Sequence, residues 1–190
     1  MRYRARPDGE GSVVALFNGE SERFLLESFA LLLQEFPRVG GPAFQHAITR
    51  LRARFGEPAV AMLQDSVVLL SEMRVAGRLP RLRLGRARSA GKDEIFFIAM
   101  LAALQRGDNG RAIEAAIALL DSGHVYAVIG AARALAQRLV RLGLVLRQVQ
   151  SPLFDYFAGY PVIAEAPSVA DTLAEVSRPR RPVLRLLKSA

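Results

Sequence analysis

The sequence contains no cysteine and only two histidines. Without cysteine, the chain cannot form a disulfide, a thiolate nucleophile, an iron–sulfur cluster or a cysteine-ligated zinc site. The histidines, His46 and His124, are far apart in the sequence, and neither has a second ligand at the spacing of a metal motif. No GxSxG motif is present either. We therefore expect a protein that is not an enzyme and that holds no metal or cofactor.

Long hydrophobic runs are also missing. The longest charge-free apolar stretch has 11 residues, from Ile95 to Gln105, whereas a membrane-spanning helix needs roughly 20. Asp8, Glu10 and Glu20 interrupt the start of the chain before an apolar run develops, so no signal peptide is expected. These absences predict a soluble, cytoplasmic protein with no membrane partner.

Acidic residues are absent from residues 73–92, and the net charge of the chain is concentrated there. The chain carries +8 in total, and this stretch contributes +7, while residues 1–72 contribute −1. A concentrated charge raises the affinity for polyanions more than a dispersed charge does. The chain has 24 arginines and 2 lysines and is rich in Ala, Leu and Gly. That composition is typical of a GC-rich bacterial genome, so the excess of arginine over lysine carries no functional argument.

Apolar residues recur at helical spacing through most of the chain. This periodicity, with the positions of Pro and Gly, predicts helices over residues 20–36, 44–55, 58–70, 94–105, 110–121 and 125–142, and two short ones near residues 153–157 and after Ser168. Asp93 is the predicted N-cap of the helix at 94–105. That helix is apolar nearly all round, so we expect it at the centre of the fold. The predicted buried stripe of the helix at 58–70 is Val60, Leu63, Val67 and Leu70.

These elements predict a mainly α fold with six to eight helices in a single bundle-like orthogonal array. The domain is expected to span residues 1–176, with a basic tail over residues 177–190. Residues 1–17 combine an alternating pattern, the turn sequence PDGEG and the β-branched run SVVALF. This part of the domain is therefore predicted to form a short β-hairpin.

The Arg-rich segment, defined here as residues 74–92, connects two predicted helices. Its positive residues are Arg74, Arg78, Arg81, Arg83, Arg86, Arg88 and Lys92. Pro80 and the alternation of arginine with leucine predict an extended chain, with Arg81 and Arg83 on one side and the leucines anchored on the other. Arginine binds phosphates and carboxylates bidentately. Lys92 lies at a helix N-terminus, which also favours anions.

Two further features could bind a partner. Residues 111–142 have the order helix, glycine-containing turn, helix that is typical of a helix-turn-helix, but Tyr126, Ala127 and Val128 would be its base-reading residues and offer few hydrogen-bonding groups. Aromatic residues gather after residue 151 and could form a partner-binding patch or close the end of the core. This candidate patch consists of Phe154, Tyr156, Phe157 and Tyr160.

The sequence favours a non-enzymatic regulatory or accessory protein that binds DNA or RNA, mainly the phosphate backbone, through the Arg-rich segment. Nothing in it identifies a base-reading helix. The arginines could instead bind an acidic protein surface or pair with carboxylates of the fold. The alternative function is a protein–protein adaptor or a homo-oligomeric helical interaction protein, using the apolar C-terminal region and the same arginines.

Overall fold

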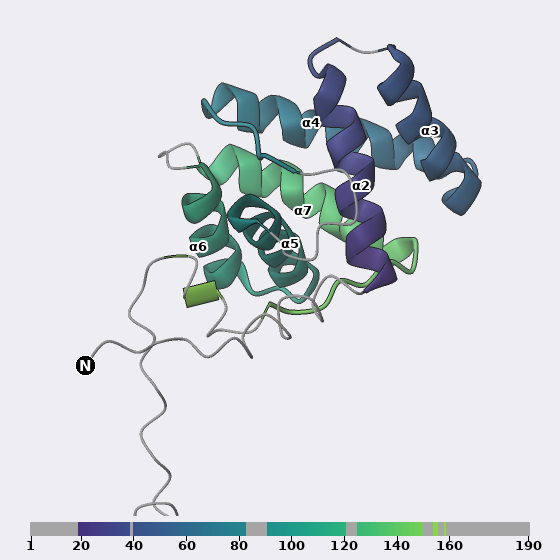
Figure 1. Cartoon of the computed structure of the whole chain (residues 1–190). Coiled ribbons are helices and arrows are strands. Elements are labelled where there is room, and N and C mark those ends of the chain that lie inside the picture. The colour runs from purple at the N-terminus through teal and green to yellow at the C-terminus, as the bar shows by residue number, and fades with distance from the viewer. Residues whose placement is uncertain are drawn as a thin grey trace, which may run out of the picture. The chain divides into compact units, whose positions relative to one another are not determined.

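The computed structural model describes residues 19–38, 40–82, 91–120 and 125–149, together with residues 154, 155 and 158. All of these residues belong to one compact unit. Within them the regular structure is helical, without strands, and consists of six helices (Figure 1). They are α2 (Glu20–Glu35), α3 (Pro42–Phe55), α4 (Ala59–Val75), α5 (Lys92–Gln105), α6 (Asn109–Leu120) and α7 (Val125–Arg141).

The predicted mainly α fold is confirmed for this part of the chain, and five of the six helices lie within two residues of their predicted ranges, while α4 extends five residues beyond its predicted end, to Val75. Residues 154, 155 and 158 are helical too, at the place of the short helix predicted near residues 153–157. The β-hairpin predicted over residues 1–17, the helix predicted after Ser168 and the domain boundary at residue 176 lie outside the described residues. The total of six to eight helices therefore stays a prediction.

Helix α5 is buried on every side, as its apolar sequence predicts. Each residue from Asp93 to Leu104 is buried, and the helix packs against α6 and α7. The Phe97 ring meets Phe29 of α2 with ring centroids 4.8 Å apart. On another side, the Phe96 ring meets the ring of Phe154 at 5.1 Å. The hydrophobic core is therefore built around this helix.

The buried face of α4 is turned relative to the predicted one, which is confirmed only in part. Of the predicted stripe, Leu70 is fully buried, Leu63 and Val67 are half-buried against the core, and Val60 is exposed. The other buried residues are Ala59, Met62, Ser66, Leu69 and Met73. Because the polar residues of α4 are spread around the helix, its periodicity does not select a face. Contacts with α3 and α7 select it instead.

The chain that follows α7 is extended and is held by side chains instead of by a partner strand. The Gln105 side chain donates a hydrogen bond from Nε2 to the Leu144 carbonyl (2.9 Å) and accepts one at Oε1 from the Leu146 amide (2.8 Å). The Arg147 amide donates to Glu22 Oε1 of α2 (2.5 Å). Leu144 and Leu146 are buried. These side chains satisfy backbone groups that would otherwise be left unpaired in the protein.

No single helix in the described ranges is long and apolar enough to cross a membrane. Helices α6 and α7 meet the criteria of length and composition only when taken together, and they are bent by 118° relative to each other. Each of them turns one apolar face into the core of this unit.

Adjacent residues of α4 test which of its faces is buried. Leu69 is fully buried, whereas Val68 is 51% exposed. Replacing Leu69 by Ala should lower the free energy of unfolding by about 2–5 kcal/mol, because it leaves a cavity in the core. Val68→Ala should change it by no more than about 0.5 kcal/mol. Chemical denaturation followed by circular dichroism measures both. A larger loss for Val68→Ala than for Leu69→Ala would contradict this orientation of α4.

Candidate nucleic-acid interface

The Arg-rich segment begins inside the last turn of α4, which includes Arg74 and Val75. Gly77 adopts a positive φ of 88°, a conformation that residues with a side chain rarely adopt. The Arg78 amide then donates back to the Met73 carbonyl (3.1 Å), which is a common way to satisfy the last carbonyls of a helix. The chain leaves α4 in a defined direction as a result.

Asp93, the residue after the Arg-rich segment, fastens the first half of that segment to the start of α5. Its Oδ1 accepts a hydrogen bond from Nη2 of Arg78 (2.7 Å), and its Oδ2 accepts one from the backbone amide of Arg81 (2.8 Å). Only 8% of the Asp93 side chain is exposed. The prediction that Asp93 is the N-cap of α5 is wrong, because Gly91 occupies that position. Asp93 lies inside the first turn, where its carboxylate can reach the chain that enters the segment.

The described cations of the segment divide into one that pairs with a carboxylate and three that are exposed. Arg78 forms an ion pair with Asp93. Arg74 and Arg81 are exposed, and within the described residues their guanidinium groups have no partner. Lys92 is exposed as well, and its ammonium lies 5.6 Å from the centroid of the Phe96 ring. Three more predicted binding residues lie outside the described residues, namely Arg83, Arg86 and Arg88.

Arg81 and Leu82 lie as the predicted alternation places them, while Arg83 and Leu84 lie outside the described residues. Pro80 is buried, and Leu79 and Leu82 pack against the hydrophobic core. Arg81, between them, is exposed. The apolar residues thus fix the chain to the fold while the guanidinium group faces solvent.

The N-terminus of α5 is already supplied with negative charge by the chain itself. The Gly91 amide donates to Oε2 of Glu94 (2.5 Å), and both Asp93 and Glu94 are buried. Carboxylates in the first turn stabilise a helix by complementing its dipole. An incoming phosphate would therefore meet these carboxylates at the helix end, so the outward side chains are better placed than the amides to bind it.

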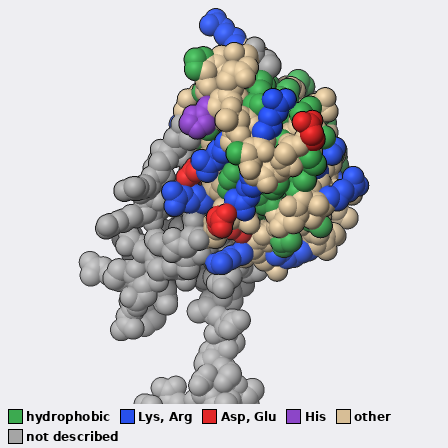
Figure 2. Space-filling view, turned by 90° about the vertical axis from the view of Figure 1, so that its right-hand side faces the viewer, with side chains coloured by type: hydrophobic (Ala, Val, Ile, Leu, Met, Phe, Trp, Pro, Cys, Tyr) green, Lys and Arg blue, Asp and Glu red, His purple; other side chains and the backbone are tan. Residues whose placement is uncertain are grey.

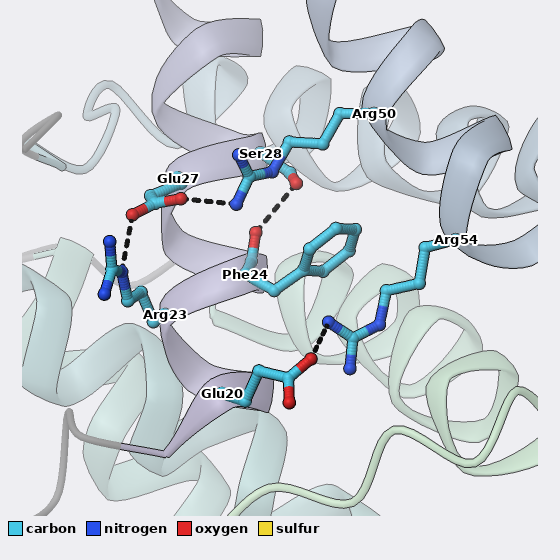
Figure 3. Close-up of polar contacts among 7 residues, drawn as sticks. All are labelled: Glu20, Arg23, Phe24, Glu27, Ser28, Arg50 and Arg54. Atoms are coloured by element: carbon cyan, nitrogen blue, oxygen red, sulfur yellow. Dashed lines mark hydrogen bonds and ion pairs between the residues drawn. The ribbon is translucent and has the colours of Figure 1, made fainter.

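Several other arginines pair with carboxylates within the fold. Glu27 of α2 binds Arg23 of the same helix and Arg50 of α3 (Figure 3). Hydrogen bonding to Glu27, together with its charge, raises the pKa of the Arg23 guanidinium above its usual value. Asp65 of α4 binds Arg138 of α7. Arg74 and Arg81, by contrast, have no carboxylate partner within the described residues.

The candidate helix-turn-helix corresponds to α6 and α7. Their 118° bend and the four residues between them, 121–124, match the usual geometry of that motif, although these four residues lie outside the described ranges. Tyr126 is 78% exposed and Ala127 is exposed, but Val128 is fully buried. Val128 is therefore not available to read a base.

Phe154 does not belong to an exposed aromatic patch. Phe154 is fully buried against Phe96, and the Arg111 guanidinium covers its ring at 3.5 Å. Arg111 also pairs with Glu114 at 3.0 Å. Phe154 closes the core and offers no surface to a partner, while Tyr156, Phe157 and Tyr160 lie outside the described residues.

Sequence reasoning missed the role of Asp93 and Glu94. The available signal was their position, because they are the first acidic residues after the basic stretch. His46 is exposed on α3. No group of three or more His, Asp or Glu side chains in the part of the chain described by the structure is placed to hold a metal ion.

Removing the Asp93 carboxylate should loosen the attachment of the Arg-rich segment. We expect Asp93→Asn to lower the free energy of unfolding by about 1–3 kcal/mol, because Arg78 loses its partner in a largely buried site. Glu72→Gln, which removes a carboxylate without a described partner, should change it by less than about 0.5 kcal/mol. Denaturant titrations of both variants measure the difference. Equal midpoints for Asp93→Asn and the wild type would rule out this attachment.

No protein family matches the sequence, and no curated protein and no solved structure is similar enough to count as a match. The geometry and chemistry of its own residues are therefore the basis on which a function can be proposed for this chain.

Proposed function

We propose that this chain is a non-enzymatic cytoplasmic regulatory or accessory protein that binds nucleic acid through the Arg-rich segment. The observation that supports this most is that Asp93, which directly follows the segment, binds Arg78 and Arg81 in its first half. A segment fastened to the fold in this way loses less conformational freedom when it binds than a free chain does. Its exposed arginines are thereby presented from a fixed base.

The charge of the segment after internal pairing sets the expected strength of binding. Arg78 is neutralised by Asp93, which leaves Arg74, Arg81 and Lys92, with three arginines outside the described residues. If each of these six charges neutralises one DNA phosphate, the logarithm of the affinity should fall with the logarithm of salt concentration at a slope of about −5. Contacts of this kind are independent of sequence.

Replacing Arg81, Arg83, Arg86 and Arg88 together by Gln tests the proposed site. Fluorescence anisotropy with a labelled DNA duplex, measured between about 50 and 200 mM salt, should show wild-type binding that weakens by about a thousandfold. The variant should bind more weakly at low salt, and its salt slope should be shallower by about 3 to 4 units, because four phosphate contacts are lost.

A matched control removes the same charge elsewhere. The control replaces four arginines by Gln, namely Arg23, Arg38, Arg133 and Arg141. It should keep most of the wild-type salt slope, since these residues lie outside the Arg-rich segment. Equal losses in the two quadruple variants would show that net charge alone drives binding. A wild type that fails to bind at the lowest salt would exclude the proposed function.

A second candidate function, homo-oligomer formation, is favoured by the exposed face of α4. Val60, Val68 and Val75 lie on one side of this helix and are 38%, 51% and 76% exposed. Gln64 and Ser71 share that side and carry no charge. In a chain with a net charge of +8, an uncharged apolar face allows a second copy to approach without strong repulsion.

Val68→Glu tests this second candidate. If copies associate through α4, a carboxylate at Val68 should be buried without a partner in the interface and should shift the chain to monomer. Sedimentation velocity over a range of protein concentrations measures the shift, with Gln148→Glu as a control of equal charge at another exposed position. Association should persist at high salt, unlike binding to DNA. A wild type that is monomeric at every concentration would exclude it.

A further inference from the structure

Helix α3 lies at the edge of the fold (Figure 1). It packs mainly against α2 and α4, and it buries only Phe44, Ala47 and Leu51. The remainder of the helix is half-buried or exposed. Figure 2 views the molecule from the side on which α3 lies in Figure 1, and there Lys and Arg side chains are more prominent than Asp and Glu.

Side chains of α2 fix the orientation of α3. Arg54 donates to Glu20 Oε1 at 2.9 Å, and Arg50 donates to Glu27. Both guanidinium groups also lie over the Phe24 ring, at 4.5 and 5.1 Å from its centroid, as Figure 3 shows. Arg50 and Arg54 therefore hold α3 against α2.

The start of α3 is fixed by a residue of another helix. Glu35, at the end of α2, accepts hydrogen bonds from the amides of Ala43 (2.9 Å) and Phe44 (3.1 Å). Gly41 precedes them, and a Cβ at this position would lie 2.3 Å from a Glu35 carboxylate oxygen. This close approach explains the glycine. With both its end and its side attached to α2, α3 is presented as a rigid element.

The outer face of α3, defined here as Gln45, His46, Thr49, Arg52 and Ala53, is exposed. These residues share one face because they follow the helical repeat. No acidic residue occurs anywhere in α3, and within the described residues the Arg52 guanidinium has no partner. The outer face is therefore positive, free of carboxylates and rich in hydrogen-bonding groups.

We propose that the outer face of α3 reads bases in the major groove of duplex DNA. This inference rests on the nucleic-acid binding proposed above, and it adds sequence selectivity, which the Arg-rich segment does not supply. Arg52 has the donor pair that matches guanine O6 and N7, and Gln45 has the donor and acceptor that match adenine. Thr49 donates its hydroxyl to the Gln45 carbonyl (2.9 Å), which leaves its methyl group available to contact the thymine methyl.

The width of the major groove favours duplex DNA over double-stranded RNA as the partner of α3. Among the helices, α3 is also better suited than α7 to read bases. An α-helix with its side chains is about 10–12 Å in diameter, and the major groove, about 12 Å wide, admits one. In double-stranded RNA the major groove is too narrow for side chains to read. Helix α7 is a poorer reader, because Val128 is buried and Ala127 has no hydrogen-bonding side chain.

Selection from a pool of DNA duplexes with a randomised core tests this proposal with the full-length chain. Sequencing of the retained duplexes should show an enriched motif for the wild type. Arg52→Ala should lose the preference at one base pair by about tenfold or more, and Gln45→Ala should lose it at a different base pair. Arg141→Ala, which removes the same charge from an exposed position of α7, should keep the motif unchanged.

The outcomes separate this proposal from the one on which it rests. If the wild type retains no duplexes, nucleic-acid binding fails and α3 recognition fails with it. If duplexes are retained without an enriched motif, or with a motif that both α3 variants keep, base reading by α3 is overturned while binding through the Arg-rich segment stands. Equal affinity for the enriched duplex and for its RNA counterpart would also overturn the proposal.

Discussion

The burial of α5 from Asp93 to Leu104 is the constraint on which the rest of the structure depends. A helix with no exposed side must satisfy the carboxylates of its first turn inside the protein, because buried charges without partners are strongly destabilising. Asp93 does so by binding Arg78 and the Arg81 amide. The same central helix supplies Gln105, which fastens the extended chain after α7. The burial of α5 thus determines both the packing of the core and the placement of the Arg-rich segment.

The helices and the central position of α5 could be predicted, because Pro and Gly mark the boundaries and an apolar surface on all sides requires burial. The buried face of α4 could be predicted only in part, since its polar residues are spread around the helix and leave no periodicity that selects one face. The attachment by Asp93 and the capping of α3 by Glu35 depend on which helices meet in space. Of the candidate site, the exposed arginines were predictable, and the residues that hold them were not.

The fold uses its charges in two ways. Most arginines at helix contacts pair with carboxylates, as Arg50 does with Glu27 and Arg138 with Asp65. Arg74, Arg81 and Arg52 have no such partner within the described ranges. In the proposed account, the Arg-rich segment supplies affinity through phosphates and α3 supplies selectivity through base edges. This division is common in proteins that bind DNA.

The central claim is that the unpaired arginines meet DNA while the fold behind them stays unchanged. Amide chemical-shift mapping by NMR, with the full chain titrated by a short DNA duplex, tests it most directly. We predict that the largest shifts occur in residues 74–82 and 91–92 and on the outer face of α3, and that the amides of α5 beyond its first turn shift little. Shifts confined to the valine face of α4, or the absence of any shift at low salt, would contradict the account.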